Sequence, residues 1–149
     1  MRKERQRMEI NLKLKHYFVT ELVFDYKSTK FNYNVDFKEM KSHFEKKVST
    51  KGDNEVLISL RFVHELEDNY PFVLKVTVNG IFEMEKWKSS KKKEFVMLEN
   101  TTAILFPYLR TLVGDLTLQG FGKAFIIPVM NTYALFNNPA NEEINESQK

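Results

Sequence analysis

AILFPYLRTLVGDLTLQGFGK, from Ala103 to Lys123, is the stretch that decides the fold of this 149-residue chain. Its large apolar residues recur at intervals of three and four, the spacing that predicts one face of an α-helix. From Thr101 to Gly120 the chain carries only two charges, Arg110 and Asp115. A helix on the surface of a small protein normally has a polar outer stripe. Because this helix lacks one, we expect one side to pack on the chain's own sheet and the other on a partner subunit.

The ends of this helix are predicted from its capping residues. Residues 100–102 (Asn-Thr-Thr) supply candidate N-caps, and Gly120 suits the position just beyond the last turn. Pro107 is compatible only with a start near Thr102 or Ala103, since the first N–H groups of a helix have no internal partner and a proline costs nothing there.

Four segments ahead of the helix alternate between apolar and polar residues, the period of two that predicts half-buried strands. They are residues 10–26, a segment opening at Phe31 and weakening after Phe37, residues 55–66 and residues 72–82. Short links without helices join them, so we expect an antiparallel four-stranded meander. The first segment is long for a strand, which predicts a bulge, a bend or continuation across a subunit boundary. Asn79-Gly80 predicts a further bulge.

The expected fold is therefore α+β. A four-stranded antiparallel sheet precedes a long helix, an apolar connection (FGKAFIIP) and a short C-terminal helix near residues 129–136. Residues 9–136 suffice for a single domain with one modest core. We expect a basic, flexible head (residues 1–8) and a disordered polar tail (residues 137–149) on either side of it.

Composition narrows the class of protein. The chain has no cysteine, which excludes disulfides, thiolate metal sites and a cysteine nucleophile. The basic start is followed by alternation and not by an apolar run, and no segment approaches the length of a membrane helix, so we expect a cytoplasmic protein. Phenylalanine is frequent, at 13 residues. An excess of this kind requires either a core or a sticky surface to account for it.

Motifs for catalysis and metal binding are weak. GFGK, residues 120–123, lacks the earlier glycine and the following Ser or Thr of a phosphate loop and comes after a helix, so it indicates a helix cap. His16, His43 and His64 have no ligand at a suitable spacing. No Gly-x-Ser-x-Gly elbow is present. We therefore expect no enzyme activity, no metal and no cofactor.

The basic run from Lys86 to Glu94, KWKSSKKKE, is the one segment that suggests nucleic acid. It has a tryptophan among lysines, but Glu83, Glu85 and Glu94 lie close by, and no second aromatic residue builds a stacking platform. A solvated charged link accounts for the run better, so nucleic acid is not an expected partner.

Several short segments of the sequence resemble segments of one known family, in the same order and with comparable spacing. They are HYFVTELVFDY, FVLKVTVNGIF, ILFPYLR, GFGKAFIIPV and ALF. Together they span residues 10–136 and are similar to the first strand, the fourth strand, the opening of the long helix, the crossover loop and the second helix of the SecB export chaperones. The resemblance implies an ATP-independent holdase that binds unfolded polypeptides and assembles as a homotetramer, a dimer of dimers with its long helices between two sheets.

The resemblance also implies site residues. Clients would lie in a hydrophobic groove between the sheet, the crossover loop and the second helix, although core packing accounts for each groove residue equally well. The matching groove positions are Phe31, Phe72, Phe121, Phe125, Ile127, Tyr133 and Phe136. The subunit interface would take Leu105, Leu109, Leu112, Val113 and Leu116 from the long helix.

Handover of clients to the translocation ATPase SecA is the second expectation from the resemblance. Glu21 and Asp25 match acidic positions of the first strand that contact SecA in the family. Lys75, however, stands where the family has a glutamate, and the sequence pI of about 9.0 departs from the family's acidic character. A SecB-like adaptor dedicated to one partner, such as an antitoxin or a mobile-element protein, is therefore the alternative to a general export chaperone.

Overall fold

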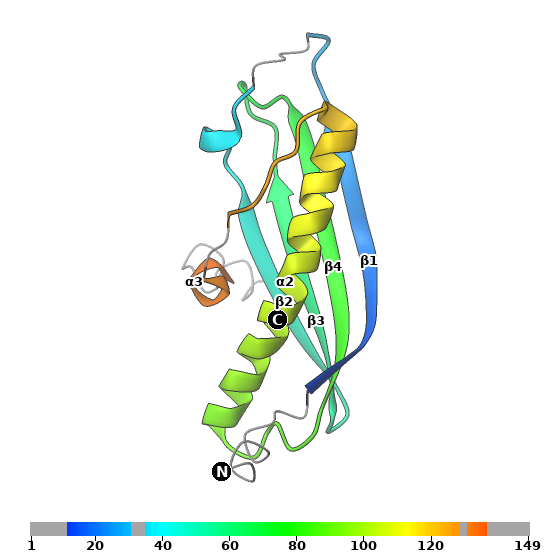
Figure 1. The fold of residues 1–149 in the computed structure, drawn as a ribbon, viewed down its shortest axis with the longest axis vertical. Coiled ribbons are helices and arrows are strands. Elements are labelled where there is room, and N and C mark those ends of the chain that lie inside the picture. Colours follow the sequence, from blue (N-terminus) through cyan, green and yellow to red (C-terminus); the bar gives the residue numbers. More distant parts are fainter. Residues whose placement is uncertain (1–11, 31–34, 129–130, 137–149) are drawn as a thin grey trace, which may run out of the picture.

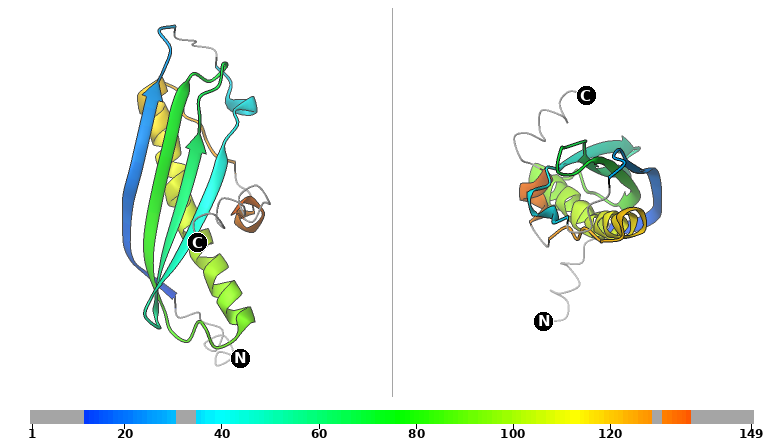
Figure 2. Two further views of the ribbon diagram at one scale, coloured as in Figure 1. Left: turned by 180° about the vertical axis from the view of Figure 1, so that it is seen from behind. Right: turned by 90° about the horizontal axis from the view of Figure 1, so that it is seen from above.

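The structure is a computed structural model that describes residues 12–30, 35–128 and 131–136. It has two layers, a curved antiparallel sheet and a long helix that runs diagonally across one face of the sheet (Figures 1 and 2). In chain order the elements are β1 (Leu12–Tyr26), η1 (Phe37–Glu39), β2 (His43–Lys51), β3 (Glu55–His64), β4 (Phe72–Met84), α2 (Lys91–Phe121) and α3 (Thr132–Phe136). The predicted fold class is confirmed.

The strand order is β1-β4-β3-β2, with all neighbours antiparallel. Successive hairpins join β2, β3 and β4, so the expected meander covers these three strands. β1 does not pair with β2 but lies at the other edge, beside β4, which gives the order of a Greek key. The inner side chains of β4 are buried along its whole length, which suits a strand enclosed between two others.

β1 contains the irregularities that its length predicted. Its register against β4 shifts between Leu14 and His16 and again between Val19 and Glu21. The residues that face the helix therefore change from even to odd and back to even numbers along the strand. This rephasing places Tyr17 on the helix side, where its ring lies 4.5 Å from that of Tyr108.

The bulge expected at Asn79-Gly80 is wrong. β4 pairs with β3 without a break from Glu83 to Leu74, and its even-numbered residues face inward throughout. Gly80 instead allows close packing under the helix. A Cβ atom at this position would lie 2.8 Å from Phe82 Cε2 and 3.2 Å from Leu105 Cδ1.

The helix α2 starts far earlier than Pro107 suggested. Ser90 is the N-cap, and its side chain accepts a hydrogen bond from the Lys93 N–H, so a start near Thr102 is wrong and Pro107 lies inside the helix. A proline there removes one backbone hydrogen bond and costs about 3 kcal/mol. Phe106 and Leu109, buried against the sheet on either side of it, hold the helix together across this position.

The C-terminal end of α2 lies at Gly122 and not at Gly120. Gly122 has a φ of 87°, a left-handed conformation that favours glycine, and its N–H donates to the Leu118 carbonyl. Gly120 lies within the helix, and a Cβ atom there would approach the ring of Phe24 to 2.5 Å. The glycine is required by helix-to-strand packing and not by the turn.

The second strand also differs from the prediction. β2 begins at His43, and Phe37 lies in the 3₁₀ turn η1, which Asp36 caps through its side chain. Residues 31–34, which include Phe31, fall outside the described part of the chain, as do the predicted head and tail. The short second helix is confirmed as α3. None of the described helices is long and apolar enough to span a membrane.

Candidate polypeptide-binding site

A continuous aromatic cluster fills the space between the sheet, α2 and α3. Neighbouring rings in it lie 5.3 to 6.3 Å apart. The cluster consists of Phe37, Phe44, Phe62, Phe72, Phe106, Phe121, Phe125 and Phe136. Its members come from η1, β2, β3, β4, α2, α3 and the segment after α2. The excess of phenylalanine is thus concentrated at one site.

The crossover loop, residues 122–128, covers this cluster and is held by specific contacts. Thr117, fully buried on α2, accepts a hydrogen bond from the Phe125 N–H at 2.7 Å and donates to the Val113 carbonyl at 2.8 Å. Lys123 donates to the Val35 carbonyl at 2.8 Å. The loop also lies close to Gly114 of α2, where a Cβ atom would be in ordinary contact with Ile126 Cδ1 at 3.4 Å. The loop is therefore a fixed part of this state of the protein.

Most of the predicted groove residues are covered by the chain itself. Phe72, Phe121, Ile127 and Phe136 are buried, with at most 5% of each exposed. Phe125 is half-buried, and Tyr133 on α3 is 47% exposed. Phe31 lies outside the described residues. The structure brings the four predicted phenylalanines that it describes together in one cluster, while the ring of Tyr133 contacts that of Phe95.

An opening to the cluster lies between η1 and the crossover loop. This cavity has a volume of about 530 Å³ and is lined by Phe37, Met40, Phe125, Ile126 and Pro128 together with Asp36, Lys38, Lys123 and Ala124. Phe37 and Phe125, whose rings are 5.4 Å apart, join it to the buried aromatic residues. An extended apolar chain could enter here without disturbing the sheet.

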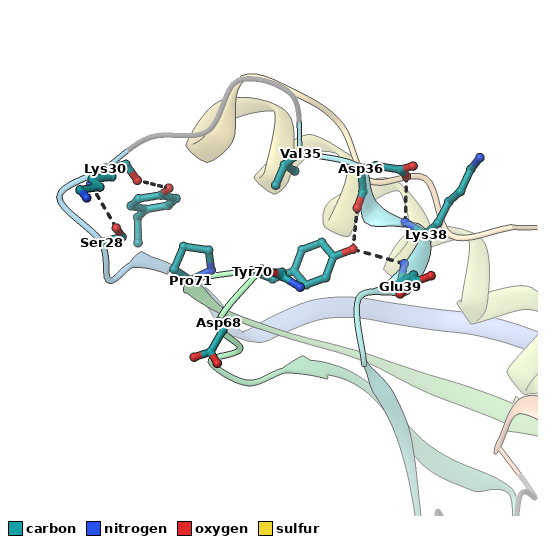
Figure 3. Close-up of a pocket in the computed structure, with 11 residues that line it drawn as sticks. Ser28, Lys30, Val35, Asp36, Lys38, Glu39, Asp68, Tyr70 and Pro71 are labelled. Atoms are coloured by element: carbon teal, nitrogen blue, oxygen red, sulfur yellow. Dashed lines mark hydrogen bonds between the residues drawn. The ribbon is translucent and has the colours of Figure 1, made fainter.

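A second cavity of about 540 Å³ lies beside the first and is mainly polar (Figure 3). Tyr70 donates its hydroxyl hydrogen to the Asp36 carbonyl at 2.6 Å and accepts from the Glu39 N–H at 3.2 Å. Asp36 also accepts from the Lys38 N–H at 3.0 Å. These bonds join lining residues to one another, so we interpret the polar pocket as the anchor of η1 and not as a reaction centre.

Glu21 and Asp25 both lie on the outer face of the sheet, opposite Thr77 and Val73 of β4. Arg61 donates to Glu21 at 2.7 Å, and Thr77 donates to the same carboxylate at 3.0 Å. The hydrogen bond from Arg61 lowers the pKa of Glu21 and outweighs partial burial, which raises it. Asp25 pairs with Lys27 at 2.6 Å. Each carboxylate thus has a cation of its own chain beside it.

The predicted interface residues divide into two groups. Leu105, Leu109 and Val113 are fully buried against the chain's own sheet. Leu112 and Leu116 are half-buried and pack against the core. The five thus lie on the face of α2 that packs on the sheet, and their role in a subunit interface stays a prediction.

The opposite face of α2 carries apolar residues that sequence reasoning missed. Ile104, Tyr108 and Leu118 are exposed, and they lie on the same side as Thr111 and Asp115. Counted together, the five positions are separated by three or four residues, a signal that was available once one face had been assigned to the sheet. The edge strand β1 adds exposed Phe18, Val19, Leu22 and Val23.

The sequence and the fold together identify the family of this protein. Residues 4–143 match the SecB family, described as "Preprotein translocase subunit SecB". The chain belongs to this family. Among the described residues no group of three or more His, Asp or Glu side chains is placed to hold a metal ion.

Individual relatives are distant. A protein-export protein SecB of Ruegeria pomeroyi is 32% identical over 50% of this chain and 46% of its own length. A protein of Methanocaldococcus jannaschii described as "Uncharacterized protein MJ0357" is 33% identical over 53% of this chain and 52% of its own. The matches thus span about half of each relative.

One solved structure with a similar fold is the Mycobacterium tuberculosis SecB-like chaperone Rv1957 in complex with a ChAD peptide from the Rv1956 HigA1 antitoxin. The TM-score is 0.58 at 12% identity, over 85% of this chain and 91% of that one. At this identity the likeness establishes the fold alone.

Proposed function

We propose that this protein is an ATP-independent holdase that binds apolar segments of non-native polypeptides at the aromatic cluster. The observation that carries the proposal is the continuity between the open cavity at Phe37 and Phe125 and the buried rings behind them. Burial of apolar surface is non-directional, so such a site accepts many sequences. Weak contacts at several points along one chain then retain it through effective concentration.

Client binding at full depth requires the crossover loop to move. Phe136 packs on Phe44 and Phe106, and Ile127 is covered, so a client that reaches these residues replaces contacts the chain makes with itself. The free energy needed to open the loop then offsets part of the free energy of client binding, which weakens the apparent affinity for the client. Binding at the open cavity first, followed by displacement of the loop, is the sequence of events that the geometry favours.

We propose further that the protein is a homo-oligomer, a dimer of dimers. The support is the exposed apolar face of α2 together with the exposed apolar residues of the edge strand β1. A monomer would leave both in water, and surfaces of this kind mark contacts between proteins. An edge strand also offers unpaired backbone groups to a second copy.

An adaptor dedicated to one partner is the alternative, and the outer face of the sheet favours it over general export. Arg61 and Lys27 neutralise the two carboxylates that match the family's SecA contacts. Lys75 adds a half-buried cation on the same face. The fold neighbour in complex with an antitoxin peptide is an example of a SecB-like chaperone with such a partner.

An aggregation assay tests the proposal. A denatured client protein is diluted into buffer with and without the full chain, no nucleotide is added, and light scattering is followed. Suppression at a stoichiometric ratio is expected for a general holdase. If scattering is unchanged while a pull-down yields a single stoichiometric partner, the holdase is replaced by the dedicated adaptor.

A further inference from the structure

A basic patch lies at the N-terminal end of α2 and in the turn before it. We define it as Lys86, Lys88, Lys91, Lys92 and Lys93, all of which are exposed. Glu85 and Glu94 are the acidic residues within the same segment. None of the ion pairs among described residues involves these five lysines. The patch therefore presents its charge to the solvent.

The turn that carries the patch is held rigidly. Trp87 is 1% exposed, and its indole N–H donates to the Asp53 carbonyl at 3.0 Å, which fastens the turn to the loop between β2 and β3. Lys86 has a φ of 54°, a left-handed conformation that is uncommon for a residue with a side chain. A strained lysine in a fixed turn is more typical of a binding surface than of a solvated linker.

The three lysines at the start of α2 lower the stability of the helix. Lys91, Lys92 and Lys93 occupy its first three positions, where the positive end of the helix dipole disfavours cations. Acidic residues at these positions would make a more stable helix. The sequence thus keeps positive charge at a place where helix stability favours the opposite.

Exposed apolar side chains adjoin the lysines. Phe95 and Val96 follow Lys91 and Lys92 by four residues, which places each pair on the same side of the helix. Phe95 is 52% exposed, and its ring lies 5.6 Å from that of Tyr133 on α3. Figure 1 shows α3 beside the N-terminal half of α2.

This contact joins the basic patch to the polypeptide-binding site. Tyr133 belongs to the same short helix as Phe136, which closes the aromatic cluster. A chain leaving the cluster past α3 would therefore cross Phe95 and then the lysines. The apolar site and the charged one form a single path along the surface.

The geometry favours a polypeptide over a nucleic acid. Single-stranded nucleic acid needs ring faces on which bases can stack. Trp87, the aromatic residue among the lysines, is buried, and Phe95 meets Tyr133 edge to face at 69°. What the patch offers beside its charge is the apolar surface of Phe95 and Val96, which suits mixed acidic and apolar side chains.

We propose that the basic patch, with Phe95 and Val96, selects polypeptide segments in which acidic residues flank an apolar stretch. This inference rests on the proposed holdase or adaptor function and names the class of polypeptide that the site prefers. The apolar stretch binds at the aromatic cluster, and the acidic flank pairs with Lys91, Lys92 and their neighbours.

Three labelled peptides with one shared apolar segment test it by fluorescence anisotropy with the full chain. Their flanks are glutamate, serine or lysine. At low salt the glutamate-flanked peptide should bind about tenfold more tightly than the serine-flanked one, the sum of several exposed ion pairs. The lysine-flanked peptide should bind most weakly, and the differences should shrink as salt is raised.

The double variant Lys91→Glu with Lys92→Glu should reverse the order of the peptides. Acidic residues suit the first turn of a helix, so this variant is expected to fold. The matched control is Lys47→Glu with Lys51→Glu, two exposed lysines of β2 on the outer face of the sheet. It makes the same change in net charge and should leave the order unaltered.

The outcomes separate the two proposals. Equal binding of all three peptides overturns the selection for acidic flanks and leaves the holdase intact. No binding of the serine-flanked peptide removes the apolar site itself. Tighter binding of a single-stranded RNA oligonucleotide than of the glutamate-flanked peptide, lost in the Lys91/Lys92 variant, reassigns the patch to nucleic acid.

Discussion

Arg61 of β3 and Glu21 of β1 face each other across β4 on the outer side of the sheet, with Nε donating to Oε1 at 2.7 Å. The same guanidinium donates to Glu45 of β2 at 3.2 Å. One side chain thus connects both edge strands to the middle of the sheet. Thr77 of β4 completes this row, which crosses all four strands.

This row of interactions should make the free energy of unfolding fall at low pH. Hydrogen bonding to Arg61 lowers the pKa of Glu21 below its ordinary 4.5. The stabilising effect is therefore complete above about pH 4.5 and is lost as the pH falls through the lower pKa of the folded state. Urea unfolding at a series of pH values should give a smaller slope below pH 4.5 for Glu21→Gln than for the unaltered chain. An identical slope would contradict this.

Removal of Arg61 should be more harmful than removal of Glu21. Arg61→Met leaves Glu45, which is 8% exposed, without its guanidinium, and a carboxylate buried in this way is costly. We expect a loss of about 1–3 kcal/mol in the free energy of unfolding, against about 1 kcal/mol for Glu21→Gln. Denaturant unfolding at neutral pH measures both, and equal losses would argue against a role for Glu45.

The crossover loop should loosen when the hydroxyl of Thr117 is removed. Thr117→Val keeps the shape of the side chain but takes away the acceptor for the Phe125 N–H. Faster amide exchange is expected in residues 124–127, with exchange in β3 unchanged, and a loss of about 1–2 kcal/mol in stability. Thr117→Ser is the control, because it retains the oxygen. Unaltered exchange at Phe125 would show that other contacts hold the loop.

Gly114 and Gly120 should respond differently to the same substitution. Both lie inside α2, where alanine is favoured over glycine by about 1 kcal/mol. Gly114→Ala meets only ordinary contacts and should be neutral or stabilising. Gly120→Ala collides with the ring of Phe24 and should destabilise by about 1–3 kcal/mol. Thermal unfolding distinguishes them, and a double variant with Phe24→Val should lose less than the sum of the single changes.

Substitutions on the two faces of α2 should have different effects, one on the stability of the fold and the other on assembly. Leu109→Ala empties part of the core and should lower the free energy of unfolding by about 2–5 kcal/mol while the subunits stay associated. Leu118→Asp, at a position that is 48% exposed, should instead lower the mass found by light scattering. An unchanged mass for Leu118→Asp, with Ile104→Asp also unchanged, would remove this face from the proposed interface.

The alternation and helical spacing of the sequence predicted the elements well, because burial on one face depends on local pattern. β3, β4 and α3 were placed close to their observed bounds. The position of β1 beside β4 was not predictable from short links, since strand order depends on which edges pair in three dimensions. Pro107 led to a predicted start of α2 that is too late in the chain. The helix continues through this proline because packing on the sheet outweighs the lost hydrogen bond.

The sequence predicted which aromatic residues gather at the candidate site, but it did not predict that they are buried. Phe72, Phe121, Phe125, Ile127 and Phe136 do gather at one place, yet sequence matching could not show that the chain covers most of them itself. The predicted interface residues lie on the side of α2 that packs on the sheet. A row of leucines marks a buried face, but only the position of the sheet determines what buries it.

The two register shifts in β1 bear on what the edge of this sheet will accept. A regular edge strand with exposed apolar side chains is a template on which further chains can stack without limit. In β1 the exposed Val19 and Leu22 flank one of the shifts. The row of backbone donors and acceptors is therefore interrupted where the strand exposes these apolar side chains. Only a strand with matching interruptions can pair along its full length. The two shifts thus close this edge of the sheet to regular strands.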